Sequence, residues 1–141
     1  MIGVVVAAHG DLASALVGTA RSVVQLDAHV EAVAIRQDDD TASYGARLNE
    51  AVHHVDGHGG VLILTDMFGG TPSNVGLTLH REGEVEVLTG ANLPMLIKAL
   101  QLSTSEMDLA TVAKRVKESG QRAIAIASEV LGIDSIKEHS A

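Results

Sequence analysis

Two runs of apolar residues constrain the fold of this 141-residue chain more than any other feature. One run covers residues 2–8, and the other covers residues 61–64. A strand with one face in water alternates between apolar and polar residues. A continuous apolar run is instead typical of a central strand in a parallel sheet that helices cover on both faces. The two runs therefore predict an α/β fold with a mainly parallel sheet.

The segments around these runs predict alternating strands and helices. Apolar and β-branched residues indicate two more strands, over residues 29–35 and 84–88. Apolar periodicity and capping residues predict helices over residues 11–25, 41–55, 71–80, 92–102 and 105–119. This order predicts a three-layer α/β/α sandwich around a mainly parallel sheet of four strands.

Particular residues are expected to begin and end these helices. Asp11, Thr71 and Ser105 stand where an N-cap side chain would accept a backbone N–H. Ser105 and Asp108 also have the spacing of a capping box, with Asp in place of the usual Glu. Gly120 is expected to end the last of these helices.

We expect a single domain over residues 1–131, because a chain of this length can bury one core. The polar tail over residues 132–141 is expected to fray. Residues 123–127 alternate small and branched apolar side chains, which fits either a short strand or part of a helix over residues 122–131. As a strand, the segment would add antiparallel to the exposed edge at residues 84–88 of a second copy, which predicts a homodimer.

Composition disfavours several classes of function. Tyr44 and Phe68 are the only aromatic residues, so the chain has almost no platform for stacking nucleic-acid bases or sugar rings. The 18 acidic and 10 basic residues give a net charge of −8, which disfavours binding to nucleic acid further. The absence of cysteine excludes disulfides and zinc-thiolate sites. The first apolar run is too short for a signal peptide or a membrane span, so we expect a cytoplasmic protein without membrane insertion.

Each of the two apolar runs leads to a side chain suited to chemistry. His9 follows the first run, and Asp66 follows the second after one threonine. Reactive groups gather at the carboxyl ends of parallel strands, so these side chains face each other if their strands are neighbours. A carboxylate that accepts the Nδ1 proton fixes the tautomer and leaves the Nε2 lone pair free to attack an electrophile. We therefore expect His9 to be a nucleophile that Asp66 orients.

A glycine-rich turn comes shortly after the second run. Gly69 and Gly70 permit a tight backbone, and Thr71 with the proline after it is expected to open a helix. Backbone N–H groups, a hydroxyl and a helix N-terminus together make an anion site near the expected position of Nε2. With Gly10, which directly follows the histidine, these residues are expected to bind a phosphoryl group.

The other histidines do not form a metal-ligand set in the sequence. His53, His54 and His58 lie close together, but adjacent helical residues point about 100° apart and no acidic partner has ligand spacing. A small-anion or metal site made of His9 and Asp66 is an alternative of a different class. Walker A, G-x-G-x-x-G and G-x-S-x-G motifs are absent, which disfavours nucleotide-binding enzymes and α/β hydrolases.

Three segments resemble the IIA domain of the mannose-type (mannose–fructose–sorbose) sugar phosphotransferase system. They are VVAAHG over residues 5–10, GVLILTDMFGGTPSN over residues 60–74 and LTGANLPML over residues 88–96. The segments occur in the order of the family, and the resemblance covers about residues 1–127. The glycine–threonine–proline turn favours this family over the related phosphotransfer subunit of dihydroxyacetone kinases, which usually lacks such a turn.

The resemblance implies a phosphotransferase component that forms a strand-exchanged homodimer and uses no cofactor or metal. His9 would accept a phosphoryl group from the carrier protein HPr and pass it to a IIB component. Asp66 matches the carboxylate that hydrogen-bonds this histidine, and Thr71 matches the hydroxyl on the phosphate side. The residues expected to contact partner proteins are Met67, Phe68, Ser73, Asn92 and Met95.

Two departures bear on the role within such a system. No IIB domain follows in the sequence, so the acceptor would be a separate chain. Asp11 stands where some members carry an aromatic residue, which leaves the partner preference open. The alternative function is a regulatory phosphorelay module, whose phosphorylation state is read by a partner rather than used for sugar uptake.

Overall fold

The computed structural model describes residues 1–25, 29–67 and 69–132. The strands are β1 (Gly3–His9), β2 (Val30–Ile35), β3 (Val61–Thr65) and β4 (Val85–Leu88). The helices are α1 (Leu12–Val23), α2 (Thr41–Val55), α3 (Thr71–Thr78), α4 (Leu93–Leu102), α5 (Leu109–Arg122) and α6 (Ala127–Val130). The four predicted strands are confirmed.

The four strands run parallel in the order β2-β1-β3-β4. β1 lies between β2 and β3, with His9 paired to Ile35 of β2 and Ala7 paired to Thr65 of β3. This register brings the carboxyl ends of β1, β2 and β3 to one edge of the sheet. The two apolar runs are therefore neighbours, and the residues that follow them lie close together.

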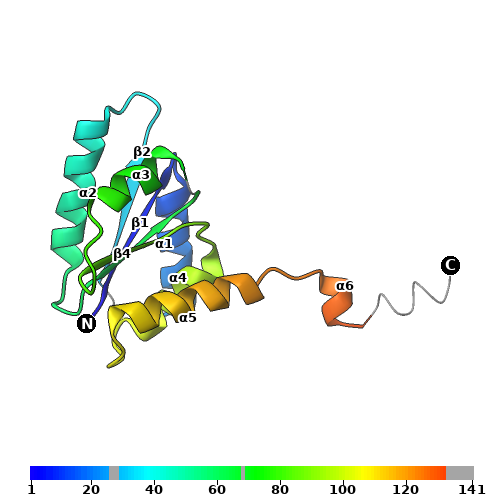
Figure 1. Ribbon diagram of the computed structural model, residues 1–141. Coiled ribbons are helices and arrows are strands. Elements are labelled where there is room, and N and C mark those ends of the chain that lie inside the picture. Colours follow the sequence, from blue (N-terminus) through cyan, green and yellow to red (C-terminus); the bar gives the residue numbers. More distant parts are fainter. Residues whose placement is uncertain (26–28, 68, 133–141) are drawn as a thin grey trace.

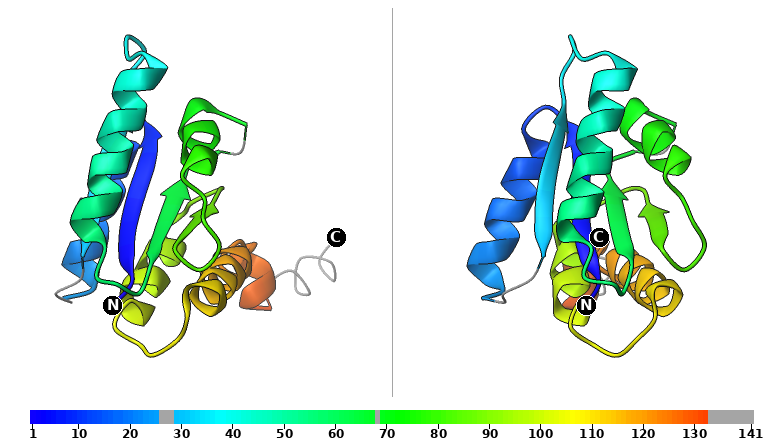
Figure 2. Two further views of the ribbon diagram at one scale, coloured as in Figure 1. Left: turned by 60° about the vertical axis from the view of Figure 1, so that its left-hand side comes forward. Right: turned by 90° about the vertical axis from the view of Figure 1, so that its left-hand side faces the viewer.

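Helices cover both faces of the sheet, as Figures 1 and 2 show. One face packs against α1, α4 and α5, and the other packs against α2 and α3. Val4, Val5 and Ala7 of β1 are fully buried, although successive side chains point to opposite faces. Burial on both faces explains the uninterrupted apolar run, and the predicted three-layer α/β/α sandwich is confirmed.

The predicted caps of α1 and α5 are wrong. Asp11 occupies the N-cap position of α1, but its side chain makes no capping hydrogen bond and forms an ion pair with Arg36 at 2.8 Å. Ser105 lies outside α5, and Asp108 caps this helix by accepting the Thr111 N–H at 2.8 Å. In the first case a cation distant in the sequence takes the carboxylate, and in the second the later member of the proposed capping box is the cap.

The prediction that Gly120 ends its helix is also wrong, because α5 continues to Arg122. A Cβ atom on Gly120 would overlap the side chain of Met95 in α4. The carbonyl of Gly120 also accepts a hydrogen bond from the Asn92 side chain at 3.2 Å. Glycine is therefore required here by the close approach of two helices and not by a helix end.

The segment after α5 leads away from the body of the molecule (Figure 1). Residues 124–126 are neither helix nor strand, and the short α6 follows them. A continuous helix over residues 122–131 is therefore wrong, whereas pairing of residues 123–127 with a second copy stays a prediction. The single-domain boundary at 131 also stays a prediction, and residues 133–141 of the expected tail lie outside the described residues.

Candidate functional site

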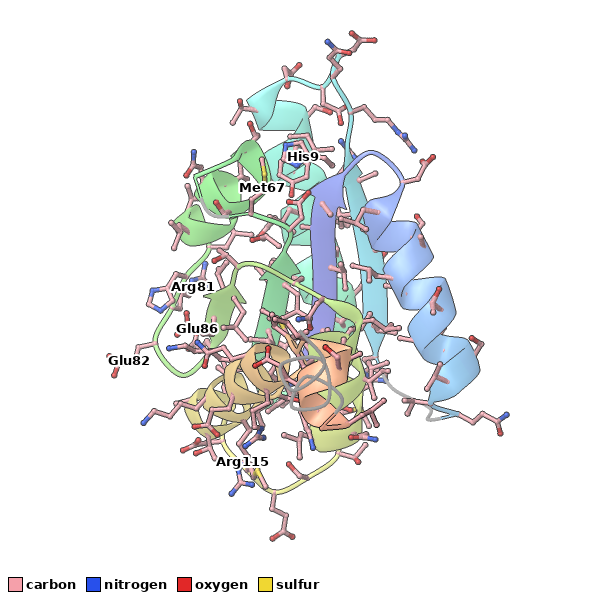
Figure 3. The ribbon with its side chains drawn as sticks, turned by 90° about the vertical axis from the view of Figure 1, so that its right-hand side faces the viewer. His9, Met67, Arg81, Glu82, Glu86 and Arg115 are labelled. Carbon is pink, nitrogen blue, oxygen red and sulfur yellow. The ribbon has the colours of Figure 1, made fainter. Side chains whose placement is uncertain are left out.

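His9 and Asp66 are in contact at the carboxyl ends of β1 and β3. Nδ1 of His9 lies 2.8 Å from Oδ2 of Asp66, and the backbone N–H of His9 donates to the same oxygen at 3.1 Å. The other carboxylate oxygen accepts the N–H of Met67 at 3.0 Å. Figure 3 shows His9 and Met67 at this end of the sheet. Three hydrogen bonds thus fix the carboxylate against the imidazole ring.

The environment of Asp66 favours its ionised form. Burial raises the pKa of this carboxyl group, but hydrogen bonds from the side chain and backbone of His9 outweigh burial and hold the pKa below its usual value. The carboxylate can therefore only accept at neutral pH, so we place the proton of the neutral imidazole on Nδ1. Nε2 makes no hydrogen bond to any described residue. Its lone pair is then available to an electrophile.

An open depression of about 490 Å³ borders His9 at the carboxyl ends of β1 and β2. The residues that line it among those described are His9, Gly10, Ile35, Arg36, Gln37, Asp39, Thr41 and Thr71. The His9 side chain is 46% exposed, whereas that of Asp66 is 13% exposed. The imidazole of His9 is therefore open to solvent, and the carboxylate that contacts it is largely shielded.

The turn before α3 is held by a serine rather than by the predicted threonine. Gly69 has a φ of +84°, and its N–H donates to the hydroxyl of Ser73 at 2.9 Å. The same hydroxyl donates to the carbonyl of Gly70 at 3.2 Å. Gly70 is the N-cap residue and Thr71 is the first residue of α3, so the prediction that Thr71 caps the helix is wrong. The hydroxyl of Thr71 is left available to a ligand.

The four residues expected to bind phosphate are not equivalent. The N–H of Gly10 donates to the carbonyl of Ile35 at 3.0 Å, and the N–H of Gly69 is taken by a serine, so neither is free. The N–H groups of Gly70 and Thr71 have no partner among the described residues. Because they lie at the N-terminus of α3, these two groups are the donors best placed for an anion.

This arrangement predicts different effects on stability for two substitutions in α3. Ser73→Ala is expected to lower the free energy of unfolding by about 1–3 kcal/mol, because it removes the acceptor of a backbone N–H. Thr71→Ala is expected to change it by less than about 0.5 kcal/mol, as is usual where no cap or buried contact is lost. Urea denaturation followed by circular dichroism measures both values. Equal losses in the two variants would contradict the assignment of the serine as the residue that holds the turn.

The residues expected to contact partners divide into exposed and buried ones. Met67 is 54% exposed beside the site, and Phe68 lies outside the described residues. Ser73 and Met95 are buried, with exposed fractions of 0% and 4%. Asn92 caps α4 by accepting the Met95 N–H at 3.0 Å. Within this chain the side chains of Ser73, Asn92 and Met95 stabilise the turn and the helix packing, and their contact with partner proteins stays a prediction.

Arg36 also borders the depression, although no sequence motif pointed to it. It directly follows β2, and its guanidinium forms the ion pair with Asp11. The signal that would have identified Arg36 is its position at a strand end, which is the same signal that singled out His9 and Asp66.

Two further features are absent from the described part of the chain. No group of three or more His, Asp or Glu side chains is placed to hold a metal ion. Nδ1 of His53 instead lies 2.8 Å from the carbonyl oxygen of Asn49. Nδ1 of His54 lies 3.4 Å from a carboxylate oxygen of Glu31, and its Nε2 lies 3.6 Å from one of Glu50. Within the same ranges, none of the helices has the length and apolar character needed to cross a membrane.

Comparisons with known proteins give consistent results. The family model described as the fructose IIA component of the phosphotransferase system matches residues 3–117. The fructose-specific EIIA component of Bacillus subtilis (strain 168) is 26% identical over 93% of this chain and 90% of its own length. The mannose-specific EIIAB component of Escherichia coli (strain K12) is 25% identical over 87% of this chain, which spans only 38% of that relative. The crystal structure of an EIIA component from Streptococcus agalactiae superposes with a TM-score of 0.82 at 24% identity, covering 92% of this chain and 99% of that chain.

Proposed function

This chain belongs to the family of fructose IIA components of the phosphotransferase system, and we propose that it carries a phosphoryl group transiently on His9. The observation that carries the proposal is the 2.8 Å contact between Nδ1 and the Asp66 carboxylate beside an open depression. This contact leaves Nε2 as the nucleophilic nitrogen, and Thr71 at the start of α3 borders the same depression.

The proposed transfer follows from this geometry. Nε2 of His9 attacks the phosphorus atom of the donor's phosphohistidine, so that an Nε2–P bond forms as the donor's N–P bond breaks. The ring becomes cationic, and its Nδ1–H remains hydrogen-bonded to Asp66, whose charge balances the imidazolium. The N–H groups of Gly70 and Thr71 and the N-terminus of α3 stabilise the phosphoryl oxygens. Attack by an acceptor on the same phosphorus atom returns the imidazole to its neutral form.

Family membership supports HPr as the donor and a IIB component as the acceptor, both meeting this chain in the cytoplasm. The exposed imidazole and the neighbouring Met67, which is 54% exposed, provide an accessible surface for such partners.

The test is incubation of the purified chain with phosphoenolpyruvate, enzyme I and HPr, followed by intact-mass spectrometry. One acid-labile phosphate per chain is expected, and an unlabelled chain would rule out the carrier function. Addition of a IIB component should then discharge the phosphate. Labelling that no IIB component discharges would instead favour a regulatory relay.

Asp66→Asn is expected to preserve the fold and slow phosphorylation by HPr by about 10- to 100-fold. The amide oxygen can accept a hydrogen bond from Nδ1–H but carries no charge to balance an imidazolium. The substitution therefore removes a charge-assisted hydrogen bond of roughly 1.5–3 kcal/mol. Rapid-quench kinetics measure the rate, and circular dichroism checks the fold. Asp38→Asn is the matched control, because it removes an exposed carboxylate from the loop after β2. Equal rates for all three proteins would show that Asp66 has only a structural role.

A further inference from the structure

Arg36 is placed beside the reactive histidine by the sheet itself. In the parallel pairing of β1 and β2, His9 lies opposite Ile35, and Arg36 is the next residue. The N–H of Gly10 donates to the carbonyl of Ile35 at 3.0 Å, which joins the two strand ends beyond the ladder. Arg36 and His9 consequently border the same depression.

The backbone of Arg36 is held by Asp39, which Arg47 fixes in turn. The N–H of Arg36 donates to Oδ2 of Asp39 at 2.8 Å, and the Arg47 guanidinium donates to the same oxygen at 2.6 Å. Arg47 also donates to the carbonyl of Ala34 at 2.8 Å, so it ties the loop to β2. The carboxylate of Asp39 is therefore paired with Arg47, and it makes no hydrogen bond to the guanidinium of Arg36 among the described residues.

The side chain of Arg36, in contrast, is held only weakly. Among the described residues it forms one ion pair, with Asp11 at 2.8 Å, and the two side chains are 58% and 86% exposed. Ion pairs so open to water contribute little, because solvent screens them. A phosphoryl group on His9 brings nearly two negative charges and presents oxygens that a guanidinium can bind in a bidentate manner. Arg36 is the only lysine or arginine among the described residues that line the depression.

Resting on the proposed function, we propose that Arg36 exchanges its partner when His9 is phosphorylated. In the unphosphorylated protein Asp11 holds the guanidinium at the edge of the depression. In the phosphorylated protein Arg36 leaves Asp11 and binds the phosphoryl oxygens opposite the N-terminus of α3. No proton moves in this exchange, and the net charge of −8 makes a local cation at this position important.

The exchange predicts a shift in an equilibrium rather than only in a rate. A contact made only in the phosphorylated protein changes the equilibrium constant for phosphoryl transfer between HPr and this chain. A contact made only with docked HPr speeds the forward and reverse reactions equally, so the equilibrium constant stays unchanged. The equilibrium therefore separates a phosphate-binding residue from a docking residue.

The experiment measures this constant by quantifying both phosphoproteins after equilibration of phospho-HPr with each variant. Arg36→Ala is expected to lower the constant about tenfold, and Arg36→Lys to lower it less. Asp11→Asn is expected to raise it about two- to fivefold, because it releases the guanidinium beforehand. Arg81→Ala is the matched control, since Arg81 is an exposed arginine far from His9 in Figure 3 and should leave the constant unchanged.

Each possible result decides the question. Unchanged constants in Arg36→Ala and Asp11→Asn, with normal labelling of the unmodified chain, would overturn this inference and leave the proposed function intact. Slower transfer in Arg36→Ala at an unchanged equilibrium would make Arg36 a docking residue and also overturn it. An unmodified chain that takes no phosphate from HPr would overturn the proposed function together with the inference.

Discussion

Replacement of His9 by alanine is expected to abolish phosphorylation of this chain completely. His9 is the histidine whose Nδ1 lies against a shielded carboxylate at 2.8 Å while its ring borders an open depression at a helix N-terminus. Intact-mass spectrometry after incubation with phosphoenolpyruvate, enzyme I and HPr measures the loss. In the unmodified protein, nitrogen NMR is expected to place the phosphate on Nε2, because Asp66 occupies Nδ1.

His80→Ala provides a matched control for the loss of a histidine. His80 is also exposed and lies beside a carboxylate, with Nε2 3.5 Å from Glu86, but it follows the C-terminal end of α3 and not the end of a strand. This variant is expected to be phosphorylated like the unmodified chain. Phosphate on Nδ1 of His9, or full labelling of His9→Ala, would contradict the assignment of the nucleophile.

Removal of all residues after Arg122 is expected to convert a homodimer into a monomer. The segment beyond α5 carries apolar side chains that a single chain leaves in water: Ile124, Ile126, Val130 and Leu131 are 63–80% exposed. Scattered exposed apolar residues are ordinary, but a run of them at one end of a domain marks an interaction surface. We therefore predict that this segment is buried against a second copy.

The edge of the sheet offers the place for that contact. β4 is the last strand in the order β2-β1-β3-β4, so no further described strand of this chain lies along its outer edge. Val85 forms a single bridge with Arg81 there, and the Val87 N–H donates to the Glu86 carboxylate, which a partner strand would have to displace. A hollow of about 360 Å³ lies along β4, bordered by Leu77, Val87 and Met95 and by residues of α5. An extended segment 123–127 from a second copy would pair with this edge and fill the hollow, twice across a two-fold axis.

Size-exclusion chromatography with light scattering measures the result. Truncation after Arg122 leaves α5 intact, and removal of residues 133–141 alone is the control that should remain dimeric. A second variant, Ile126→Ser, keeps the length of the chain and is expected to weaken the dimer. A monomeric full-length chain, or a truncated chain that still dimerises, would refute the edge-strand pairing.

The sequence by itself determined the architecture and the central pair of the site. Burial on both faces of β1 and β3 demands apolar residues at every position, so the runs before His9 and Asp66 could be identified without a structure. Parallel strands bring their carboxyl ends to one edge, and this rule is enough to predict that an imidazole and a carboxylate face each other there. Such inferences succeed because they depend on periodicity and on topology, which the order of residues records directly.

Only the tertiary structure decided how individual side chains divide their tasks. Ser73 rather than Thr71 holds the turn before α3, Asp11 pairs with Arg36 instead of capping α1, and Gly120 is small because Met95 packs against it. Each outcome depends on which group lies within about 3 Å once distant segments have been packed together. From the sequence alone, a hydroxyl or a carboxylate has several possible hydrogen-bond partners of similar strength. The packed fold selects one of them, and that selection leaves no mark in the local pattern of residues.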